Sequence, residues 1–220
     1  MKEADVFVFL DNVQFEHRSW QCRNRIKFAN GIAWLTIPTH HGAKSKIYDV
    51  DIDNTKPWMR QHWNAIKTSY GKAPYFEQYS PFLKATYERE WTKLADLNIY
   101  VAKYLAAQLG VSPTFVQASK IGLEGKRTKL LLEICKMFGA NRYLSSIGAK
   151  DYMEEDGAAE IFEKEGIRVD FLEVNDIVYP QLFGEFIPDL SAIDCLFNCG
   201  SDAMKVMSSE KSTTYCGLGR

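Results

Sequence analysis

The sequence predicts an α/β protein with a mostly parallel sheet, flanking helices and a helical insert. Residues 6–10 form a continuously apolar, β-prone run, which is typical of a strand buried on both faces inside a parallel sheet. From residue 113 onward, strand-like and helix-like segments alternate, which favours parallel strands joined by right-handed crossovers. Residues 54–109 carry apolar side chains at helical spacing and predict the insert, within one domain that covers residues 1–220.

A hairpin is expected soon after the first strand, which ends at Asp11. The basic stretch 23–28 and the apolar run 32–38 flank Asn30-Gly31, a dipeptide that favours the tight turn between antiparallel strands. Apolar residues alternate only briefly within residues 39–53, so a loop with one short strand is expected there.

Two helices are expected in the insert. Asn54 or Thr55 can cap the first helix, and Pro57 suits its first turn. A long second helix is expected over residues 81–109, where Gly110 stops it. The first helix carries three residues on one face: Trp58, His62 and Ile66.

The second half of the chain predicts three strands and three helices. A last helix begins at Ser191, where Ser191-x-x-Asp194 fits a capping box. The other segments are strands at 114–118, 142–145 and 167–172, and helices at 126–138 and 158–165.

Composition narrows the class of protein. The formal net charge of −1 gives no overall field that would attract nucleic acid, so no nucleic-acid partner is expected. No apolar run approaches the roughly 20 residues needed to span a bilayer, and Lys2, Glu3 and Asp5 interrupt any signal peptide. A cytoplasmic location is therefore expected.

Cysteine usage also fits a reducing compartment. The five cysteines are odd in number and form no Cys-x-x-Cys pair, so no disulfide is expected. Cys195 and Cys199 are four residues apart on a helix, but no histidine lies near them in sequence, and no metal site is assigned. The sequence assigns no cofactor.

Polar side chains follow three of the predicted strands, at residues 11–27, 119–128 and 145–152. Ligands of open parallel sheets bind beyond the carboxyl ends of the strands, so these segments are expected to converge on one site. In the first segment, arginines alternate with amides and an aromatic ring. This favours binding of a small anionic ligand over a solvated basic edge strand, the plainer interpretation. The residues assigned to binding there are Arg18, Trp20, Gln21, Arg23, Asn24 and Arg25.

The other two segments add weaker candidates. Gly122, Gly125, Lys126 and Thr128 open a helix and can hold a phosphate, although an ordinary helix start explains them equally well. After the next strand, hydroxyls and a glycine can approach a ligand closely. Asn198 lies among apolar residues of the last helix and needs a polar partner, either backbone or ligand. The candidates in the third segment are Ser145, Ser146 and Lys150.

Several short motifs follow one another along nearly the whole chain. They are Leu10-Asp11-Asn12-Val13-Gln14-Phe15, Arg18-x-Trp20-Gln21-x-Arg23-Asn24-Arg25-Ile26-Lys27, Tyr70-x-Lys72-Ala73-Pro74-Tyr75-Phe76, Tyr143-Leu144-Ser145, Tyr179-Pro180-Gln181 and Ser191-x-x-Asp194-x-Leu196-Phe197-Asn198-x-Gly200. In this order they resemble the signature of the WbqC-like protein family. Asn12, Ser19 and Cys22 stand where that family more commonly has Asp, Gly and Asn.

The resemblance implies a bacterial protein linked to O-antigen and other surface-polysaccharide pathways, with a transferase role whose reaction it does not fix. Full-length family members also look loosely like pantothenate-synthetase-type nucleotidyltransferases, so a nucleotidyltransferase-like Rossmann fold is the alternative architecture.

Three functions remain open from the sequence. The first is a transferase that acts on a nucleotide-linked sugar or an acyl or amino donor, with arginines on the anionic part and Asp11 or Gln14 orienting the acceptor. The second is an ATP-dependent adenylyl-transfer or ligase enzyme. The third is a non-catalytic binding partner of a pathway enzyme.

The start of the chain carries one further expectation. An interior parallel strand normally follows a crossover connection of a dozen residues or more, whereas five residues precede Val6. The family resemblance implies an additional strand, a Gln-Pro loop and a helix before this point. The exposed edge of strand 6–10 is then expected to be filled by a second chain in a homodimer, by a swapped element or by the tail 208–220.

Overall fold

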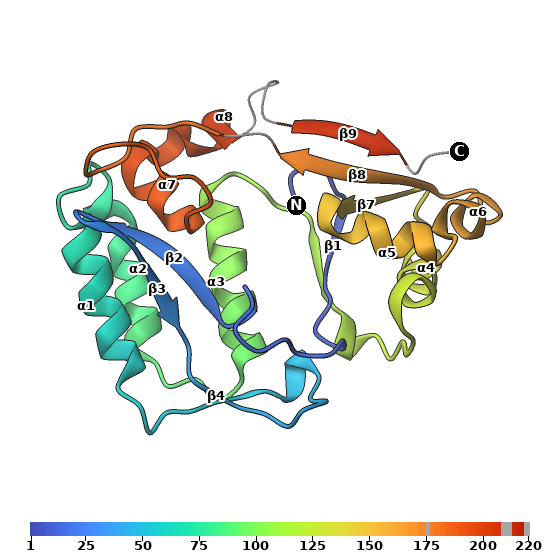
Figure 1. Cartoon of the computed structure of the whole chain (residues 1–220), viewed down its shortest axis with the longest axis horizontal. Helices are drawn as coiled ribbons and strands as arrows, with labels where there is room; N and C mark the ends of the chain where they lie inside the picture. Colours follow the sequence, from blue (N-terminus) through green and yellow to red (C-terminus); the bar gives the residue numbers. More distant parts are fainter. Residues whose placement is uncertain (175–176, 208–212, 218–220) are drawn as a thin grey trace.

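The computed structural model describes residues 1–174, 177–207 and 213–217 of the 220-residue chain (Figure 1). The predicted parallel strands are present, but they form separate small sheets instead of one sheet. β1 (Val6–Phe9) pairs in parallel with β6 (Thr114–Gln117), with Val6 opposite Thr114.

The second sheet contains strands from the second half of the chain. β7 (Arg142–Ser146) pairs in parallel with β8 (Arg168–Val174), and β9 (Thr213–Gly217) adds to the other edge of β8 in the antiparallel direction. The mixed α/β class is therefore confirmed, while the prediction of a single, mostly parallel sheet is wrong for the described residues.

The hairpin forms as predicted. β2 (Arg23–Phe28) and β3 (Gly31–Thr36) pair in antiparallel register, and Gly31 takes the positive φ of 126° that the tight turn requires. The segment after the hairpin contains a 3₁₀ turn between two short paired strands: β4 (Thr39–His40), η1 (Ile47–Asp49) and β5 (Asp51–Ile52).

The insert contains three helices, because the long second helix is interrupted. α1 (Trp58–Tyr70) buries the predicted face. The interruption between α2 (Phe76–Glu88) and α3 (Leu94–Gln108) follows from tertiary contacts. Trp91 is buried and its indole N–H donates to the Thr86 carbonyl at 2.9 Å. The backbone around Trp91 also bonds to β5 and its neighbours, and these bonds replace helical ones.

The second half contains every predicted helix and two more, because the last predicted helix ends at Cys199 and a separate short helix follows at Ala203–Met207. The other additional helix is α5 (Lys150–Glu155), which is too short to show a clear apolar period. The remaining elements are η2 (Ala118–Lys120), α4 (Arg127–Met137), η3 (Ile147–Ala149), α6 (Ala158–Glu163), α7 (Ala192–Cys199), η4 (Gly200–Asp202) and α8 (Ala203–Met207).

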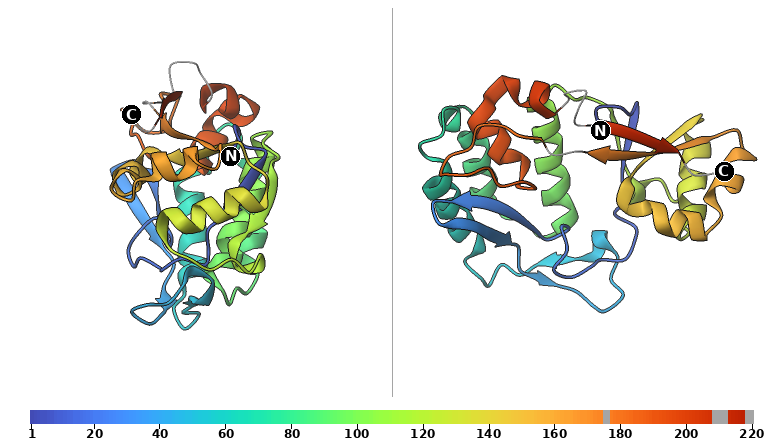
Figure 2. Two further views of the ribbon diagram at one scale, coloured as in Figure 1. Left: turned by 90° about the vertical axis from the view of Figure 1, so that its right-hand side faces the viewer. Right: turned by 45° about the horizontal axis from the view of Figure 1, so that its top comes forward.

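The elements gather in two groups with β1 and β6 between them (Figures 1 and 2). One group contains the hairpin, α1–α3 and α7, which share a core around Ile66, Tyr70 and Phe197. The other contains β7, β8 and α4–α6, whose core includes Phe162 and Phe171. A third cluster packs α1 and α3 against the loop after β1.

β1 is an edge strand in the described part of the chain. It pairs there only with β6, and all four of its residues keep partial exposure. The prediction that β1 is an interior strand is therefore wrong for these residues. Of the tail 208–220, the described residues 213–217 pair with β8 and not with β1, and the rest lies outside the described residues.

Membrane insertion was tested on helix length and apolarity. Over residues 1–174, 177–207 and 213–217, no helix is both long and apolar enough to cross a bilayer.

Candidate functional site

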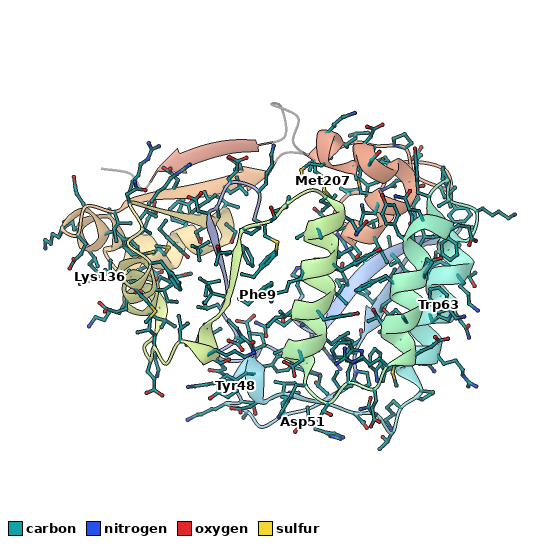
Figure 3. All side chains as sticks on the ribbon, turned by 180° about the vertical axis from the view of Figure 1, so that it is seen from behind. Phe9, Tyr48, Asp51, Trp63, Lys136 and Met207 are labelled. Atoms are coloured by element: carbon teal, nitrogen blue, oxygen red, sulfur yellow. The ribbon has the colours of Figure 1, made fainter. Side chains whose placement is uncertain are left out.

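A chamber of about 440 Å³ lies between the hairpin and α1–α3. Its size is that of small-molecule sites, and its wall is mostly apolar. Phe9 lies on the α3 side of β1 (Figure 3) and is one of the lining residues. The other apolar and aromatic lining residues are Ile26, Leu35, Ile37, Trp58, Ile66, Leu83, Tyr87, Leu97, Val101, Ala102, Leu105 and Ile193.

One side of the chamber is polar and meets solvent. Trp20 and Asn24 line this side and are exposed. Asn98 of α3 also lines it, and its side-chain amide donates to the Gln21 carbonyl at 2.7 Å, which ties the loop before β2 to the helix. The chamber is therefore an apolar space whose entrance carries amide and guanidinium groups.

Arg23 is the charged residue of this entrance. Its guanidinium carbon lies 4.1 Å from the centre of the Trp34 ring, a cation–π contact. Its Nε is buried without a hydrogen-bond partner, and no carboxylate of the described residues pairs with its side chain. A buried, unpaired donor costs free energy that an anionic ligand can recover.

Arg25 lies two residues along the same strand but is already engaged. Its guanidinium donates to the Asp189 carbonyl at 2.8 and 3.1 Å and lies 3.5 Å from the Asp189 carboxylate. Arg18 is exposed in the preceding turn with a positive φ of 60°, and it does not line the chamber. The prediction that all three arginines point into one pocket is therefore wrong, because Arg25 holds the 188–189 segment against β2.

His62 contributes a neutral imidazole to the wall of the chamber. Burial lowers its pKa from 6.5 to about 4, so the ring is uncharged at neutral pH. Nε2 lies 3.1 Å from the Thr36 carbonyl, which can only accept, and this fixes the proton on Nε2. The histidine therefore joins α1 to β3 and adds no charge to the chamber.

His62 should make the protein less stable in mild acid. Its folded-state pKa of about 4 lies below the ordinary 6.5, so between these values the unfolded chain binds a proton that the folded chain does not. Above pH 6.5 the neutral His62 costs the folded state nothing. The free energy of unfolding then decreases as the pH falls from 6.5 toward 4. Between pH 7 and pH 5, we expect His62 to lower the free energy of unfolding by about 2 kcal/mol.

Urea unfolding of the wild type and of His62→Gln at both pH values checks this expectation. The glutamine amide keeps a donor for Thr36 but does not titrate in this range, while all other groups titrate equally in both proteins. An equal loss of stability in the two proteins between pH 7 and pH 5 would contradict a neutral, buried His62.

Asp11 joins the ends of β1 and β6, as the convergence of the first two polar segments predicted. Its buried carboxylate accepts from the Ser119 backbone N–H at 2.8 Å, from the Ser119 hydroxyl at 2.6 Å and from the Gln117 amide at 2.7 Å. Beside it, the Asn12 amide donates to the Leu123 carbonyl at 3.0 Å, and its buried Oδ1 has no partner within the described ranges of the chain. Gln14 is exposed and donates to the Ala43 carbonyl at 3.2 Å.

Asp194 does not cap its own helix, so the capping-box prediction is wrong. The Ser191 N–H donates to the Arg25 carbonyl, and no side chain caps α7. The Asp194 carboxylate is buried and faces the hydroxyls of Tyr179 and Tyr70, which do not reach hydrogen-bonding geometry. Burial raises the pKa of Asp194, and these hydroxyls, together with nearby Lys27, oppose the rise.

Lys27 belongs to the same buried group of polar side chains. Its ammonium donates to the Gln181 side-chain oxygen at 3.1 Å and to the Glu185 carbonyl. These bonds hold the 181–187 segment against β2, so the role of Lys27 is structural. Asn198 donates from its side chain to the Asp194 carbonyl at 2.8 Å, within its own helix, and does not line the chamber.

The remaining candidates lie around α4 and β7, apart from the chamber. Thr128 is buried and donates to Asp156 at 2.8 Å, whereas Lys126 is exposed at the start of α4. Ser145 accepts from the Tyr143 hydroxyl at 3.4 Å, Ser146 is exposed, and Lys150 lies 3.8 Å from Glu154. The Arg127 guanidinium links the second and third segments through the Tyr152 carbonyl at 3.2 Å. The structure therefore does not bring all three polar segments to the chamber.

Among the described residues, no three His, Cys, Asp or Glu side chains gather in a way that could hold a metal ion. Four cysteines are buried as free thiols, and burial raises the pKa of Cys135 to about 11, so this thiol is protonated at neutral pH.

Two residues of the entrance region were absent from the sequence-based set. Trp34 was assigned to a strand, and Asn98 to a helix face. Alternation along β3 places Trp34 opposite Arg25 on the neighbouring strand, so hairpin register could have indicated Trp34. No sequence pattern could have indicated Asn98, because its contact with Gln21 spans 77 residues.

The comparisons with known proteins identify one family and one relative. The model of the WbqC-like protein family matches residues 1–206. A protein of Mycobacterium tuberculosis, "Uncharacterized protein Rv1507c", is 32% identical over 204 residues, which cover 91% of this chain and 86% of that protein. No solved structure matches the chain. The chain therefore belongs to the WbqC-like protein family.

Proposed function

We propose that this protein is a transferase of bacterial surface-polysaccharide or related biosynthesis, and that its donor carries an activated acyl group. The observation that supports this most directly is the unpaired Arg23 guanidinium at the entrance of the apolar chamber. Such a site complements a ligand in which an anionic group adjoins an apolar one. Membership of the WbqC-like family supports the biosynthetic role.

The chamber favours an acyl group over a sugar. Two of its inner polar groups are already engaged, since the Thr86 hydroxyl donates to the Phe82 carbonyl and His62 donates to the Thr36 carbonyl. A buried sugar hydroxyl without a partner would cost about 1–3 kcal/mol. Each buried methylene of an acyl chain would instead contribute about 0.8 kcal/mol.

In the proposed reaction, an acceptor amine or hydroxyl forms a bond to the acyl carbon. The carrier leaves with the electron pair of the broken bond, and the acceptor loses its proton to solvent. Arg23 would bind the anionic carrier and so hold the acyl carbon at the entrance. Asp11 would hold the loop at the β1 end through its bonds to Ser119, and Gln14 would orient the acceptor.

A second candidate is ATP-dependent adenylyl transfer in a Rossmann-like arrangement. It is favoured by the buried, unpaired Oδ1 of Asn12 beside the loop that ends in Gly122 and Gly125, both at positive φ. Backbone N–H groups of such glycine-containing loops can bind phosphate. Release of pyrophosphate from ATP in the presence of octanoate would favour this candidate. Ligand binding without any turnover would favour the non-catalytic partner.

Calorimetry with simple probes tests the acyl site. Octanoate should bind at least about 100-fold more tightly than acetate, since its additional methylenes enter the chamber. It should also bind about tenfold more tightly than 1-octanol, which has no charge for Arg23. Turnover of octanoyl phosphate with amino-sugar acceptors, followed as amide formation, tests the transfer itself. Equal affinity for octanoate and acetate would contradict the proposal.

A further inference from the structure

Two tryptophans of the hairpin region are exposed side by side. Trp20 is 60% exposed and Trp34 is 42% exposed, and their ring centres lie 5.3 Å apart. Folded proteins seldom leave two large rings in solvent at one place, and such pairs mark binding surfaces. Trp20 also lines the chamber entrance, so the pair lies directly beside the proposed acyl site.

Positive charge accompanies these rings. The Arg23 guanidinium lies 4.1 Å from the centre of the Trp34 ring. Arg25 lies 5.4 Å from the Trp20 ring and 5.7 Å from the Trp34 ring. Arg25 is occupied by Asp189, whereas the Arg23 side chain has no hydrogen-bond or ion-pair partner in the described part of the chain. The surface therefore offers aromatic faces for stacking and one free cation within a few ångströms of them.

We propose that Trp20 and Trp34 stack the base of a nucleotide whose phosphate is bound by Arg23 and carries the acyl group of the chamber. The acyl part rests on the proposed function, but the base and phosphate subsites do not. Every base has a π-face that stacks on tryptophan, and a guanidinium pairs with phosphate in bidentate fashion. The short distances between Arg23 and the two rings favour a nucleoside monophosphate that is joined directly to the acyl group. They disfavour a carrier in which a long arm separates the nucleotide from the acyl group.

A nucleotide fits this surface better than a neutral sugar does. A sugar stacked on tryptophan also needs side-chain donors and acceptors around its ring. The charged partners of the two rings are arginines, and the Asp189 carboxylate beside Arg25 is already paired with it. This charge pattern complements a phosphate more closely than it complements a neutral ring.

Titration calorimetry with AMP, ribose 5-phosphate and methyl glucoside tests the base subsite. AMP should bind more tightly than ribose 5-phosphate, and methyl glucoside should not bind. Trp20→Ala should weaken AMP binding by about 5- to 100-fold, because stacking on one ring is worth that much, and should leave ribose 5-phosphate binding unchanged. Trp20→Phe should retain most of the affinity. Ile32→Ala, an exposed apolar change on the same hairpin, is the matched control and should change nothing.

Each possible result either supports or overturns the proposed base subsite. Equal affinity for AMP and ribose 5-phosphate, or an unchanged AMP affinity in Trp20→Ala, would overturn the base subsite. Binding of methyl glucoside that depends on Trp20 would overturn it in favour of a carbohydrate platform. If AMP binds as expected while octanoate does not, the base subsite is supported and the acyl donor fails. If both bind, an octanoyl sulfamoyl adenosine should bind more tightly than either one.

Discussion

Replacing Arg23 with alanine is expected to cost about 1.5–3 kcal/mol of binding free energy for octanoate, or roughly a 10- to 150-fold weaker complex. Arg23 is the cation at the chamber entrance, and its buried Nε has no hydrogen-bond partner among the residues that the structure describes. Among the described residues, the change therefore breaks no hydrogen bond or ion pair, and it removes the ligand contact together with the cation–π contact to Trp34. Calorimetric titration of the wild type and the variant measures the difference.

Arg18→Gln is the matched control for this prediction. Arg18 lies five residues before Arg23, is exposed and does not line the chamber. Its loss should change octanoate affinity by less than about threefold, as for an exposed charge at a distance. A loss of affinity that is as large in Arg18→Gln as in Arg23→Ala would show that the positive field of the whole turn, and not Arg23, binds the anion.

Gly200→Ala is expected to lower the free energy of unfolding by about 2–4 kcal/mol. Gly200 ends α7 with φ at 58° and ψ at −132°, a conformation that residues with a Cβ rarely adopt. A Cβ at this position would also lie 2.5 Å from atoms of the Tyr75 ring. The free-energy costs of backbone strain and of overpacking therefore add, and urea unfolding at neutral pH measures the total loss of stability.

Gly148→Ala provides the comparison for Gly200. Gly148 lies in the 3₁₀ turn after β7, has no positive φ, and a Cβ there would meet no atom within 4 Å. We expect this variant to keep the wild-type stability within about 0.5 kcal/mol, or to gain slightly. If the two glycine variants lost equal stability, the close approach of Tyr75 to Gly200 would not be the cause.

The interruption between α2 and α3 shows that a local sequence pattern is not sufficient to predict where a helix ends. Apolar residues keep helical spacing from α2 into α3, so the sequence predicts one helix over 81–109. The helix ends instead at Glu88, and Trp91 is buried with its indole N–H bonded to the Thr86 carbonyl. The backbone of the residues after Trp91 forms hydrogen bonds with the backbone of residues 50–52. Burial of a large ring together with distant backbone hydrogen bonds outweighs the small free energy of continuing a helix.

Asp194 shows the same limit within the proposed site region. Its spacing from Ser191 fits a capping box, and the helix does begin there. The carboxylate is instead buried beside Tyr70, Tyr179 and Lys27, which come from other parts of the chain. Local sequence contains the capping pattern, but it contains no information on which distant groups will surround the carboxylate.

The sequence by itself determined the local elements of this protein. The Asn30-Gly31 turn and the buried face of α1 depend on contacts close along the chain, and both are found where predicted. The tertiary structure alone decided that Arg23 faces a chamber, that Arg25 is occupied by Asp189 and that Trp34 joins Trp20. These outcomes depend on which distant side chains pack together, and no periodicity of the chain encodes that choice.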